Sequence, residues 1–361
     1  MSGDAAKPLH SANPLESLLV VRLGAMGDII HTLPAVAALR AAFPQTKIGW
    51  VVEERWAELL CAKNAARSGA LSSTRPLVDF VHVVNTKRWR TSPFSLDTRR
   101  QMGTIRGELK DQRYELGVDF QGAIKSAIVA RFARSTVGMQ NPREKPARWF
   151  YDRRIRTSGS HVIEQYHSLA EAVAGRPLSV SRAEFPLDEG AEENISRKLE
   201  SSGELVLINP GAGWGAKQWP AERFGEVARA LAADGVRCLI NFGPGEEGLA
   251  NQVEETSGGT AKTISCSIGE LVALTRRVRL FIGGDTGPLH LAAALQVPVV
   301  ALFGPTDPVR NGPYGTKSVV LRNPASRTSL SHTSVPDAGL LKISPQEVNA
   351  AARQLLKEGH A

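Results

Sequence analysis

The sequence predicts an α/β protein built from two doubly wound, Rossmann-like domains. Short apolar segments of strand character alternate with segments of helical periodicity, and this alternation is typical of βαβ units. It begins near residue 18 and begins again near residue 205. A chain of 361 residues also suits two domains of roughly 150 to 180 residues better than one.

The first half opens with a complete strand–turn–helix unit. An apolar strand at 18–23 leads into the turn 24–28, and a helical pattern follows at 33–42. The series continues with predicted strands at 48–52, 80–84 and 116–120 and predicted helices at 125–132 and 166–174. Gly175-Arg176-Pro177 then ends the last helix, because proline cannot continue it.

The second half repeats this order, with a strand at 205–209, a glycine-rich loop and a helix at 220–234. The series continues with predicted strands at 237–242, 280–283 and 299–303 and predicted helices at 268–275 and 290–295. Two such series predict two doubly wound sheets facing a central cleft. In sheets of this kind, ligands bind at the carboxyl ends of the strands.

The predicted domain layout has four parts. Residues 1–16, which consist largely of Ser, Gly, Ala, Asn and Pro, are expected to be a disordered lead-in. The first domain covers 17–185 and the second 186–344, with the boundary where Pro186 follows a polar stretch. An amphipathic helix at 345–357 lies in the final part, 345–361, with packing back on the first domain as one option.

Composition excludes several classes of protein. No apolar run reaches about 18 residues, so we expect no membrane-spanning helix. Residues 1–16 lack the long apolar stretch of a signal peptide. The three cysteines are scattered without metal-ligand or CxxC spacing, which indicates buried thiols in a reducing cytoplasm.

The net charge of +8 is concentrated in the first half of the chain. Residues 1–180 carry 26 Lys and Arg against 16 Asp and Glu, whereas residues 181–361 carry 18 against 20. Such an excess indicates a surface that faces an anionic partner. Candidates are a phosphorylated or carboxylated acceptor, an anionic membrane and nucleic acid, and a general solubility bias is the plainer alternative.

The turn Gly284-Asp285-Thr286-Gly287 is the strongest local signal. It joins a buried strand to a helix that has Pro288 in its first turn and that Asp285 or Thr286 can cap. Gly287 lets a ligand approach the backbone, and the free N–H groups at the helix start suit a diphosphate. An ordinary capped turn is the alternative.

The turn Gly24-Ala-Met-Gly-Asp28 has the same construction in the first half. It does not fit the G-x-G-x-x-G dinucleotide fingerprint. Asp28 suits a general base, or equally a helix N-cap. Glu53 and Glu54 lie after the next strand, where a dinucleotide-binding domain carries its ribose-binding acid. A dehydrogenase is therefore an alternative.

Two further loops of the second half suit phosphate and ribose. Residues 209–220 combine three glycines, Gly213 among them, with Lys217, which can offer a point charge to a phosphate. The Gly-Lys-Ser/Thr ending of a Walker loop is missing. Glu246 and Glu247 follow a strand, so a carboxylate there suits ribose hydroxyls or is simply a solvated turn residue.

Basic residues gather in two groups of the first half, at 87–90 and at 143–148. Arginines at this density suit carboxylates and phosphates. Aromatic residues make up only 6% of the chain, so stacked bases and a nucleic-acid partner are not expected. No His, Cys or Asp cluster has metal-ligand spacing, so we expect no metal.

Five motifs together resemble those of the lipopolysaccharide heptosyltransferases, glycosyltransferase family 9. They occur in the family's order and span residues 18 to about 315. The motifs are Val-Arg-Leu-Gly-Ala-Met-Gly-Asp-Ile-Ile-His-Thr-Leu-Pro (21–34), Trp-Val-Val-Glu-Glu (50–54), Asp-Phe-Gln-Gly-Ala-Ile-Lys-Ser-Ala (119–127), Gly-Asp-Thr-Gly-Pro-Leu-His (284–290) and Phe-Gly-Pro-Thr-Asp-Pro (303–308).

The resemblance implies a GT-B fold and inverting transfer from an ADP-L-glycero-D-manno-heptose donor, without a metal or other cofactor. It places Asp28 at the position of the catalytic base. The implied donor-binding residues are Lys217, Asp285, Thr286, Gly287, Gly213, His290 and Glu247, with Glu246 as the alternative register for the ribose-binding carboxylate. The implied acceptor-binding residues are Lys87, Arg88, Arg90 and Arg143.

Type I members of the family, which the motifs match best, join the first heptose to Kdo of the inner core. The implied partners are therefore an anionic Kdo-lipid A acceptor and the cytoplasmic face of the inner membrane, with the enzyme peripheral to it. Gly24 and Ala25 replace hydroxyl residues that type I enzymes often carry, and the segment 61–76 is longer than the type I pattern. The loop 210–217 looks more like type II enzymes.

Several alternatives remain at the sequence level. A type II-like or other acceptor within the family is one. A nucleotide-sugar epimerase or hydrolase on the same scaffold is another. The third is a non-enzymatic protein that docks on membranes or nucleic acid through its basic half.

Overall fold

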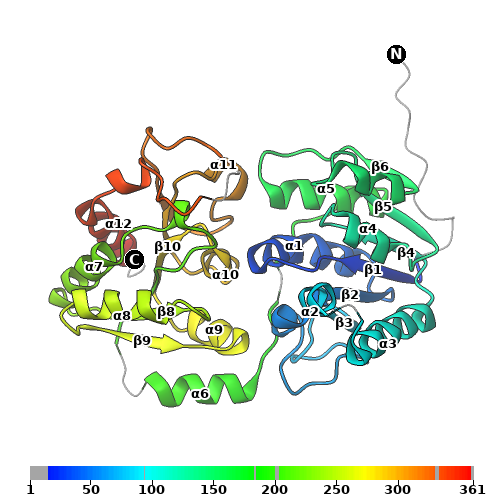
Figure 1. Ribbon diagram of the computed structural model, residues 1–361, viewed down its shortest axis with the longest axis horizontal. Coiled ribbons are helices and arrows are strands. Elements are labelled where there is room, and N and C mark those ends of the chain that lie inside the picture. Colours follow the sequence, from blue (N-terminus) through cyan, green and yellow to red (C-terminus); the bar gives the residue numbers. More distant parts are fainter. Residues whose placement is uncertain (1–14, 93, 183, 200–202, 330–332, 359–361) are drawn as a thin grey trace. The chain divides into compact units, whose positions relative to one another are not determined.

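The computed structural model describes residues 15–92, 94–182, 184–199, 203–329 and 333–358. The chain divides into two compact units, Met1–Leu187 and Asp188–Ala361 (Figure 1). The division falls two residues beyond the expected boundary. Apart from its last two residues, the predicted disordered lead-in lies outside the described residues.

Unit 1 contains a six-stranded parallel sheet with strand order β3-β2-β1-β4-β5-β6. The strands are β1 (Ser17–Val21), β2 (Lys47–Glu53), β3 (Phe80–Val84), β4 (Leu116–Asp119), β5 (Ser135–Met139) and β6 (Arg153–Ile155). The order reverses between β1 and β4, which is the doubly wound arrangement. All five residues of the central strand β1 are buried, as expected for a strand covered on both faces.

Seven helical segments accompany this sheet in the described part of unit 1. They are α1 (Met26–Ala42), η1 (Glu54–Leu59), α2 (Thr86–Thr91), α3 (Leu96–Gln112), α4 (Ile124–Ala130), η2 (Lys145–Phe150) and α5 (Val162–Ala174). Helix α1 packs against α5 and is buried around most of its circumference. It begins at Met26 rather than at residue 33, because a helix buried on all sides lacks the amphipathic period that sequence reasoning uses.

The region 61–76 is organised by the side chain of Arg75. This buried guanidinium donates to the carbonyl oxygens of Val78, Gly69 and Ala70 at 2.9, 2.7 and 2.7 Å, and also to that of Ala66. One side chain therefore serves as a donor to four backbone carbonyls in and next to this loop.

Unit 2 contains a second six-stranded parallel sheet, with order β12-β11-β10-β7-β8-β9. Its strands are β7 (Leu205–Asn209), β8 (Arg237–Phe242), β9 (Ala261–Ser265), β10 (Leu280–Gly284), β11 (Val299–Leu302) and β12 (Ser318–Leu321). Its helical segments are α6 (Glu189–Leu199), η3 (Gly215–Lys217), α7 (Ala221–Ala233), α8 (Glu247–Thr256), α9 (Ile268–Thr275), α10 (Gly287–Ala294), α11 (Pro308–Asn311), η4 (Leu340–Lys342) and α12 (Pro345–Glu358). Two α/β sheets of this kind confirm the predicted fold class.

The C-terminal helix α12 belongs to the core of unit 2. Its buried residues Val348, Ala352 and Leu355 join the same apolar cluster as Leu280 and Val300 of the sheet, and the helix packs against α7, β10, β11 and β12. Packing of this helix back on the first domain as well stays a prediction. The apolar face of α12 packs against the sheet of unit 2.

No helix in the described part of the chain is long and apolar enough to cross a membrane.

Gly117 in β4 tests how closely α4 packs on the sheet of unit 1. A Cβ at this position would lie 2.5 Å from the carbonyl oxygen of Ala130, so Gly117→Ala should lower the free energy of unfolding by about 1–3 kcal/mol. The matched control is Gly107→Ala in α3, where a Cβ would meet nothing within 4 Å. This substitution should stabilise the helix by about 0.5–1 kcal/mol, because alanine loses less backbone entropy than glycine. Denaturant unfolding measures both. Equal stabilities would contradict this packing.

Candidate active site

Asp28 lies in the first turn of α1, after the carboxyl end of β1. Its Oδ2 forms an ion pair with the Arg22 guanidinium at 2.7 Å and accepts the Ala25 N–H at 3.2 Å. Its Oδ1 has no hydrogen-bond partner among the described residues, and 37% of the side chain is exposed. Asp28 is the N3 residue of α1 and Ala25 is the N-cap, so the N-cap alternative is wrong. One carboxylate oxygen accepts from the start of the helix and the other is open, and the role of general base stays a prediction.

Arg22 holds Asp28 in place. Its side chain is buried, and its Nη1 donates to the Phe120 carbonyl at 2.7 Å. The guanidinium also lies over the Tyr166 ring, 5.5 Å from its centroid. An arginine stays protonated at any ordinary pH, so Asp28 has a fixed cation beside it. Sequence reasoning missed Arg22; the available signal was a single cation inside the apolar strand 18–23.

A buried carboxylate supports the neighbouring loop of β4. Asp119 accepts hydrogen bonds from Gln121 N–H at 2.8 Å, Ser126 Oγ at 2.9 Å and Tyr151 Oη at 2.7 Å. Burial raises the pKa of Asp119, although these hydrogen bonds oppose the shift. The network fixes the loop that presents the Phe120 carbonyl to Arg22.

In unit 2, the structure brings three of the predicted donor residues together. Asp285 forms ion pairs with Lys217 and, at 3.0 Å, with His290 Nε2. Burial by itself raises the pKa of the Asp285 carboxyl, but the hydrogen bond and charge of His290, followed by Lys217, hold that pKa well below its usual range. Lys217 Nζ also lies 4.2 Å from the centroid of the Trp214 ring. The Lys217 charge is thus already partnered by a carboxylate.

Thr286 and Gly287, which are also predicted donor-binding residues, form the start of α10. Thr286 is the N-cap, Gly287 is the first helical residue, and Thr286 Oγ1 donates to the Gly284 carbonyl at 3.2 Å. The first-turn N–H groups of an α-helix have no intrahelical acceptor, so those of Gly287 and Leu289 suit an anion. Gly213, in the loop before η3, is open, since a Cβ there would meet nothing within 4 Å.

The structure distinguishes between the two glutamates. Glu246 caps α8 and accepts the Gly243 N–H at 2.8 Å. Its carboxylate lies where a Cβ on Gly211 would be, directly against the glycine-rich loop. Glu247 is the first residue of α8 and is exposed. The geometry favours Glu246 as the residue that faces the other donor motifs.

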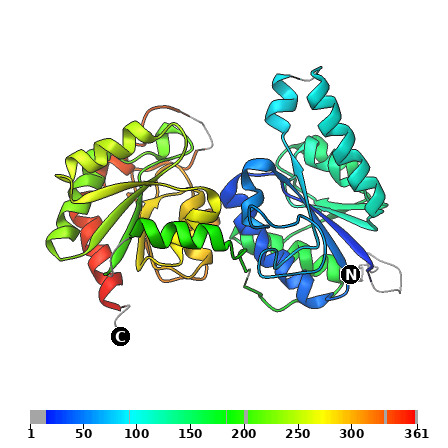
Figure 2. The ribbon, with the colours of Figure 1, turned by 90° about the horizontal axis from the view of Figure 1, so that it is seen from below.

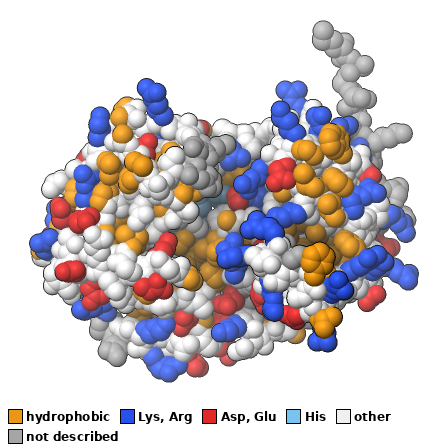
Figure 3. All heavy atoms as spheres, viewed as in Figure 1, with side chains coloured by type: hydrophobic (Ala, Val, Ile, Leu, Met, Phe, Trp, Pro, Cys, Tyr) orange, Lys and Arg blue, Asp and Glu red, His pale blue; other side chains and the backbone are white. Residues whose placement is uncertain are grey.

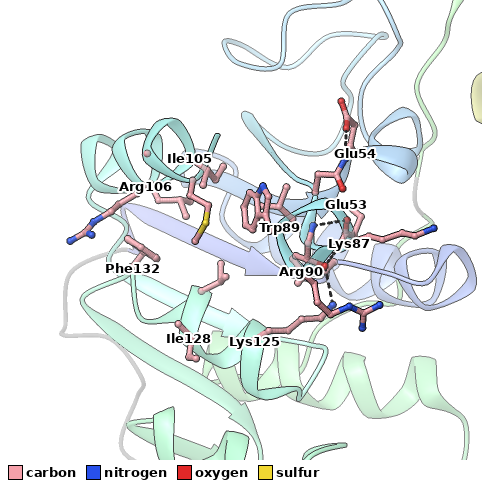
Figure 4. A pocket seen from close by; sticks show the side chains of 18 of the residues that line it. Glu53, Glu54, Lys87, Trp89, Arg90, Ile105, Arg106, Lys125, Ile128 and Phe132 are labelled. Atoms are coloured by element: carbon pink, nitrogen blue, oxygen red, sulfur yellow. Dashed lines mark hydrogen bonds between the residues drawn. The ribbon is translucent and has the colours of Figure 1, made fainter. Parts of the chain in front are cut away.

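Basic residues of unit 1, including Lys87 and Arg90 of the group 87–90, surround a groove of about 1310 Å³ (Figure 4). Trp89, Ile105, Ile128 and Phe132 form an apolar part, and Lys87, Arg90 and Lys125 lie together at one end. The remaining cations that line the groove are Arg55, Arg99 and Arg106. Glu53 and Glu54 also line the groove, so its rim carries six cations against two carboxylates. An apolar groove with a net cationic rim suits a ligand that is both lipidic and anionic.

Two of the predicted acceptor residues lie elsewhere. Arg88 forms an ion pair with Asp97 and does not line the groove. Arg143 is exposed on the segment after β5 and is also absent from the lining. Sequence reasoning missed Lys125, which belongs to the motif 119–127 and donates to Thr86 Oγ1 at 3.3 Å.

Glu53 and Glu54 have structural partners. Glu53 accepts the Thr86 N–H at 3.2 Å and the Thr86 hydroxyl, and Glu54 accepts from Asn85 Nδ2 at 3.0 Å. Both carboxylates connect the end of β2 with the start of α2. The ribose-binding alternative for this pair therefore has no geometric support. No group of three or more His, Cys, Asp or Glu in the described ranges is arranged to hold a metal ion.

Comparison with known proteins agrees with these two sheets and their turn motifs. The chain is 30% identical over 310 residues to lipopolysaccharide heptosyltransferase 1 of Pseudomonas aeruginosa, covering 84% of this chain and 83% of that protein. It is 29% identical over 315 residues to lipopolysaccharide heptosyltransferase 1 of Escherichia coli K12, covering 85% and 93%. The structure of E. coli heptosyltransferase WaaC with ADP superposes with a TM-score of 0.75 at 26% identity, over 95% of this chain and 99% of that one.

Two Rossmann-like domains with these motifs define a glycosyltransferase of the GT-B class. The model of glycosyltransferase family 9 (heptosyltransferase) matches residues 102–335. The chain belongs to this family, which confirms the resemblance drawn from the five motifs.

The depressed pKa of Asp285 predicts a specific acid sensitivity. The stability that its charge contributes is fully present above the unfolded-state pKa of about 3.9 and is lost as the pH falls from there toward the folded-state value. The melting temperature of Asp285→Asn should therefore fall less steeply than that of the wild type below about pH 4. Calorimetry over this range measures the slopes.

The control for this measurement is Asp234→Asn, which changes a partly exposed carboxylate of the same unit. It should keep the wild-type slope. If Asp285→Asn also kept that slope, the charged Asp285 would not contribute to stability.

Proposed function

We propose that the chain transfers heptose from ADP-L-glycero-D-manno-heptose to Kdo of the lipopolysaccharide inner core, with inversion and without a metal. The observation that carries this proposal is the Asp28 carboxylate, which has one oxygen fixed by Arg22 and the other open. Similarity to lipopolysaccharide heptosyltransferase 1 of two organisms supports the sugar and the acceptor. The related WaaC structure with ADP supports the nucleotide.

In the proposed reaction, unit 2 binds the donor. The N–H groups at the start of α10 bind the diphosphate, with Lys217 shared between it and Asp285. Glu246, or Glu247 in the alternative register, accepts hydrogen bonds from the ribose. Thr286, Gly287 and Gly213 leave the backbone open to the ligand, and His290 keeps Asp285 ionised. A lysine held by a carboxylate is already oriented, so little reorganisation accompanies the growth of charge on the leaving group.

The groove of unit 1 binds the acceptor in this proposal. Carboxylates and phosphates of a Kdo-lipid A molecule pair with Lys87, Arg90 and Lys125, and acyl or sugar carbons cover the apolar part. Arg143 contacts the acceptor outside the groove. Arg88 acts indirectly, through its ion pair with Asp97 between α2 and α3.

The transfer is a single in-line displacement. The acceptor hydroxyl oxygen attacks the anomeric carbon, and a new glycosidic C–O bond forms as the bond to the diphosphate oxygen breaks. Asp28 Oδ1 takes the hydroxyl proton, and ADP leaves with the electron pair of the broken bond. The ion pair with the buried Arg22 guanidinium fixes the direction of the Asp28 carboxylate before the acceptor binds. The reaction takes place at the cytoplasmic face of the inner membrane, to which the chain is peripheral.

A donor and acceptor panel tests this function directly. The protein is incubated with ADP-heptose or UDP-sugars, and with de-heptosylated core lipid, heptosylated core lipid or no lipid. Each reaction is run with and without EDTA, and the released nucleotide is measured. ADP release that needs the lipid and survives EDTA supports the proposal. Release without any lipid would indicate a hydrolase or epimerase, and release only with a heptosylated lipid would indicate a type II-like acceptor.

Asp28→Asn keeps the shape and capping ability of the side chain and removes its basicity. We expect kcat to fall by about 10²–10⁴-fold, because no other carboxylate replaces the base. Binding of ADP, measured by calorimetry, should not change. Turnover above about a tenth of wild type would disprove the assignment of the base.

Lys87→Gln and Arg90→Gln test the acceptor groove. Each should raise the KM for the lipid acceptor by about tenfold or more with little change in the KM for the donor, because a charge-assisted contact is lost. Arg88→Gln is the matched control, since Arg88 lies in the same helix but does not line the groove. A larger effect from Arg88 than from its two neighbours would place the acceptor elsewhere.

A further inference from the structure

Helices α2 and α3 form a hairpin that projects from the sheet of unit 1 (Figure 2). Two large apolar side chains lie where the helices join, Phe94 between them and Leu96 at the start of α3. They are 82% and 83% exposed, more than any other large hydrophobic side chain described. Met102, 47% exposed, lies further along α3 and lines the groove. We call Phe94 and Leu96 the hairpin tip.

The hairpin is strongly cationic. Residues 86–112 contain seven Lys and Arg against three Asp and Glu. Asp97 is paired with Arg88, and Glu108 lies 3.1 Å from His82. Six cations of the hairpin have no ion-pair partner among the described residues, namely Lys87, Arg90, Arg99, Arg100, Arg106 and Lys110. In Figure 3, Lys and Arg side chains mix with hydrophobic ones over this part of unit 1.

We propose that the hairpin tip inserts into an anionic lipid bilayer, so that the acceptor groove lies against the membrane surface. Exposed Phe and Leu side chains gain free energy when they leave water for the acyl region. The surrounding cations are attracted by anionic headgroups at the same depth. The inference rests on the proposed function in one respect, because it makes the membrane the source of the lipid acceptor.

The position of the groove supports a bilayer as the occupant. Arg99, Met102 and Arg106 of α3 line the groove, so the helix that carries Leu96 is also one wall of the acceptor site. A tip inserted in the bilayer would bring this wall to the headgroups from which a lipid enters. A second copy of the chain fits less well, since two surfaces of the same positive charge would repel each other.

Vesicle binding tests the insertion. Full-length protein is sedimented with vesicles of phosphatidylglycerol mixed equally with phosphatidylcholine, and with vesicles of phosphatidylcholine alone. We expect binding to the anionic vesicles only, weakened by salt, and about a tenfold or larger loss of partitioning for Phe94→Ser/Leu96→Ser. The matched control is Val180→Ser/Val335→Ser, which changes two side chains that are 74% and 71% exposed elsewhere. It should bind like the wild type.

Two acceptors separate this inference from the proposed function. The tip variant should lose turnover on acceptor embedded in vesicles and keep wild-type turnover on a deacylated, water-soluble acceptor, which also shows that it is folded. Wild-type binding of the tip variant to anionic vesicles, or equal binding of the wild type to phosphatidylcholine, would overturn the insertion. If the wild type turned over neither acceptor, the proposed function would fail, and the vesicle binding would still decide the insertion.

Discussion

The all-parallel arrangement of both sheets is the constraint on which the rest of the structure depends. Parallel strands gather their carboxyl ends, and the loops that follow them, at one edge of the sheet. In unit 1 this edge carries the Asp28 turn after β1 and the Asp119 loop after β4. In unit 2 it carries the glycine-rich loop after β7 and the Asp285 turn after β10. Within each unit, residues far apart in sequence therefore lie at the same edge, because parallel strands all end there.

Paired charges give each site its rigidity. Arg22 is buried in unit 1 and shares one carboxylate oxygen of Asp28 with a backbone amide, whereas Lys217 in unit 2 shares Asp285 with His290. A buried ion pair is weak evidence for stability, because desolvation of both charges offsets their attraction. It does fix the direction of a functional group before a substrate arrives, which lowers the reorganisation needed for transfer.

The sequence allowed the two-sheet architecture to be predicted, together with the turns at the carboxyl ends of the strands that carry the candidate site. Central strands such as β1 and β10 are continuously apolar, and the motif turns carry glycine and aspartate at fixed spacing. The edge strands β6, β9 and β12 were missed, since they are short and partly exposed. The inner strand β5 was also missed, whereas the edge strand β3 was predicted. The helices α2 and α3 were not predicted, because only Thr98 and Leu109 are buried in α3 and none of the residues of α2 is.

The roles of individual cations depended on contacts that spacing does not encode. Arg88 and Arg90 are two residues apart, yet one is paired with Asp97 and the other lines the groove. Lys217 was expected to face a phosphate and is already paired with Asp285. The segment 61–76, which was expected to be longer than the type I pattern, is held by Arg75, whose side chain donates hydrogen bonds to carbonyls of its own loop. Such a loop brings its own anchor and meets the sheet at the edge strand β3, where the Val81 N–H donates to the Arg67 carbonyl at 2.8 Å. A change in the length of the loop therefore leaves the central strands of the sheet as they are.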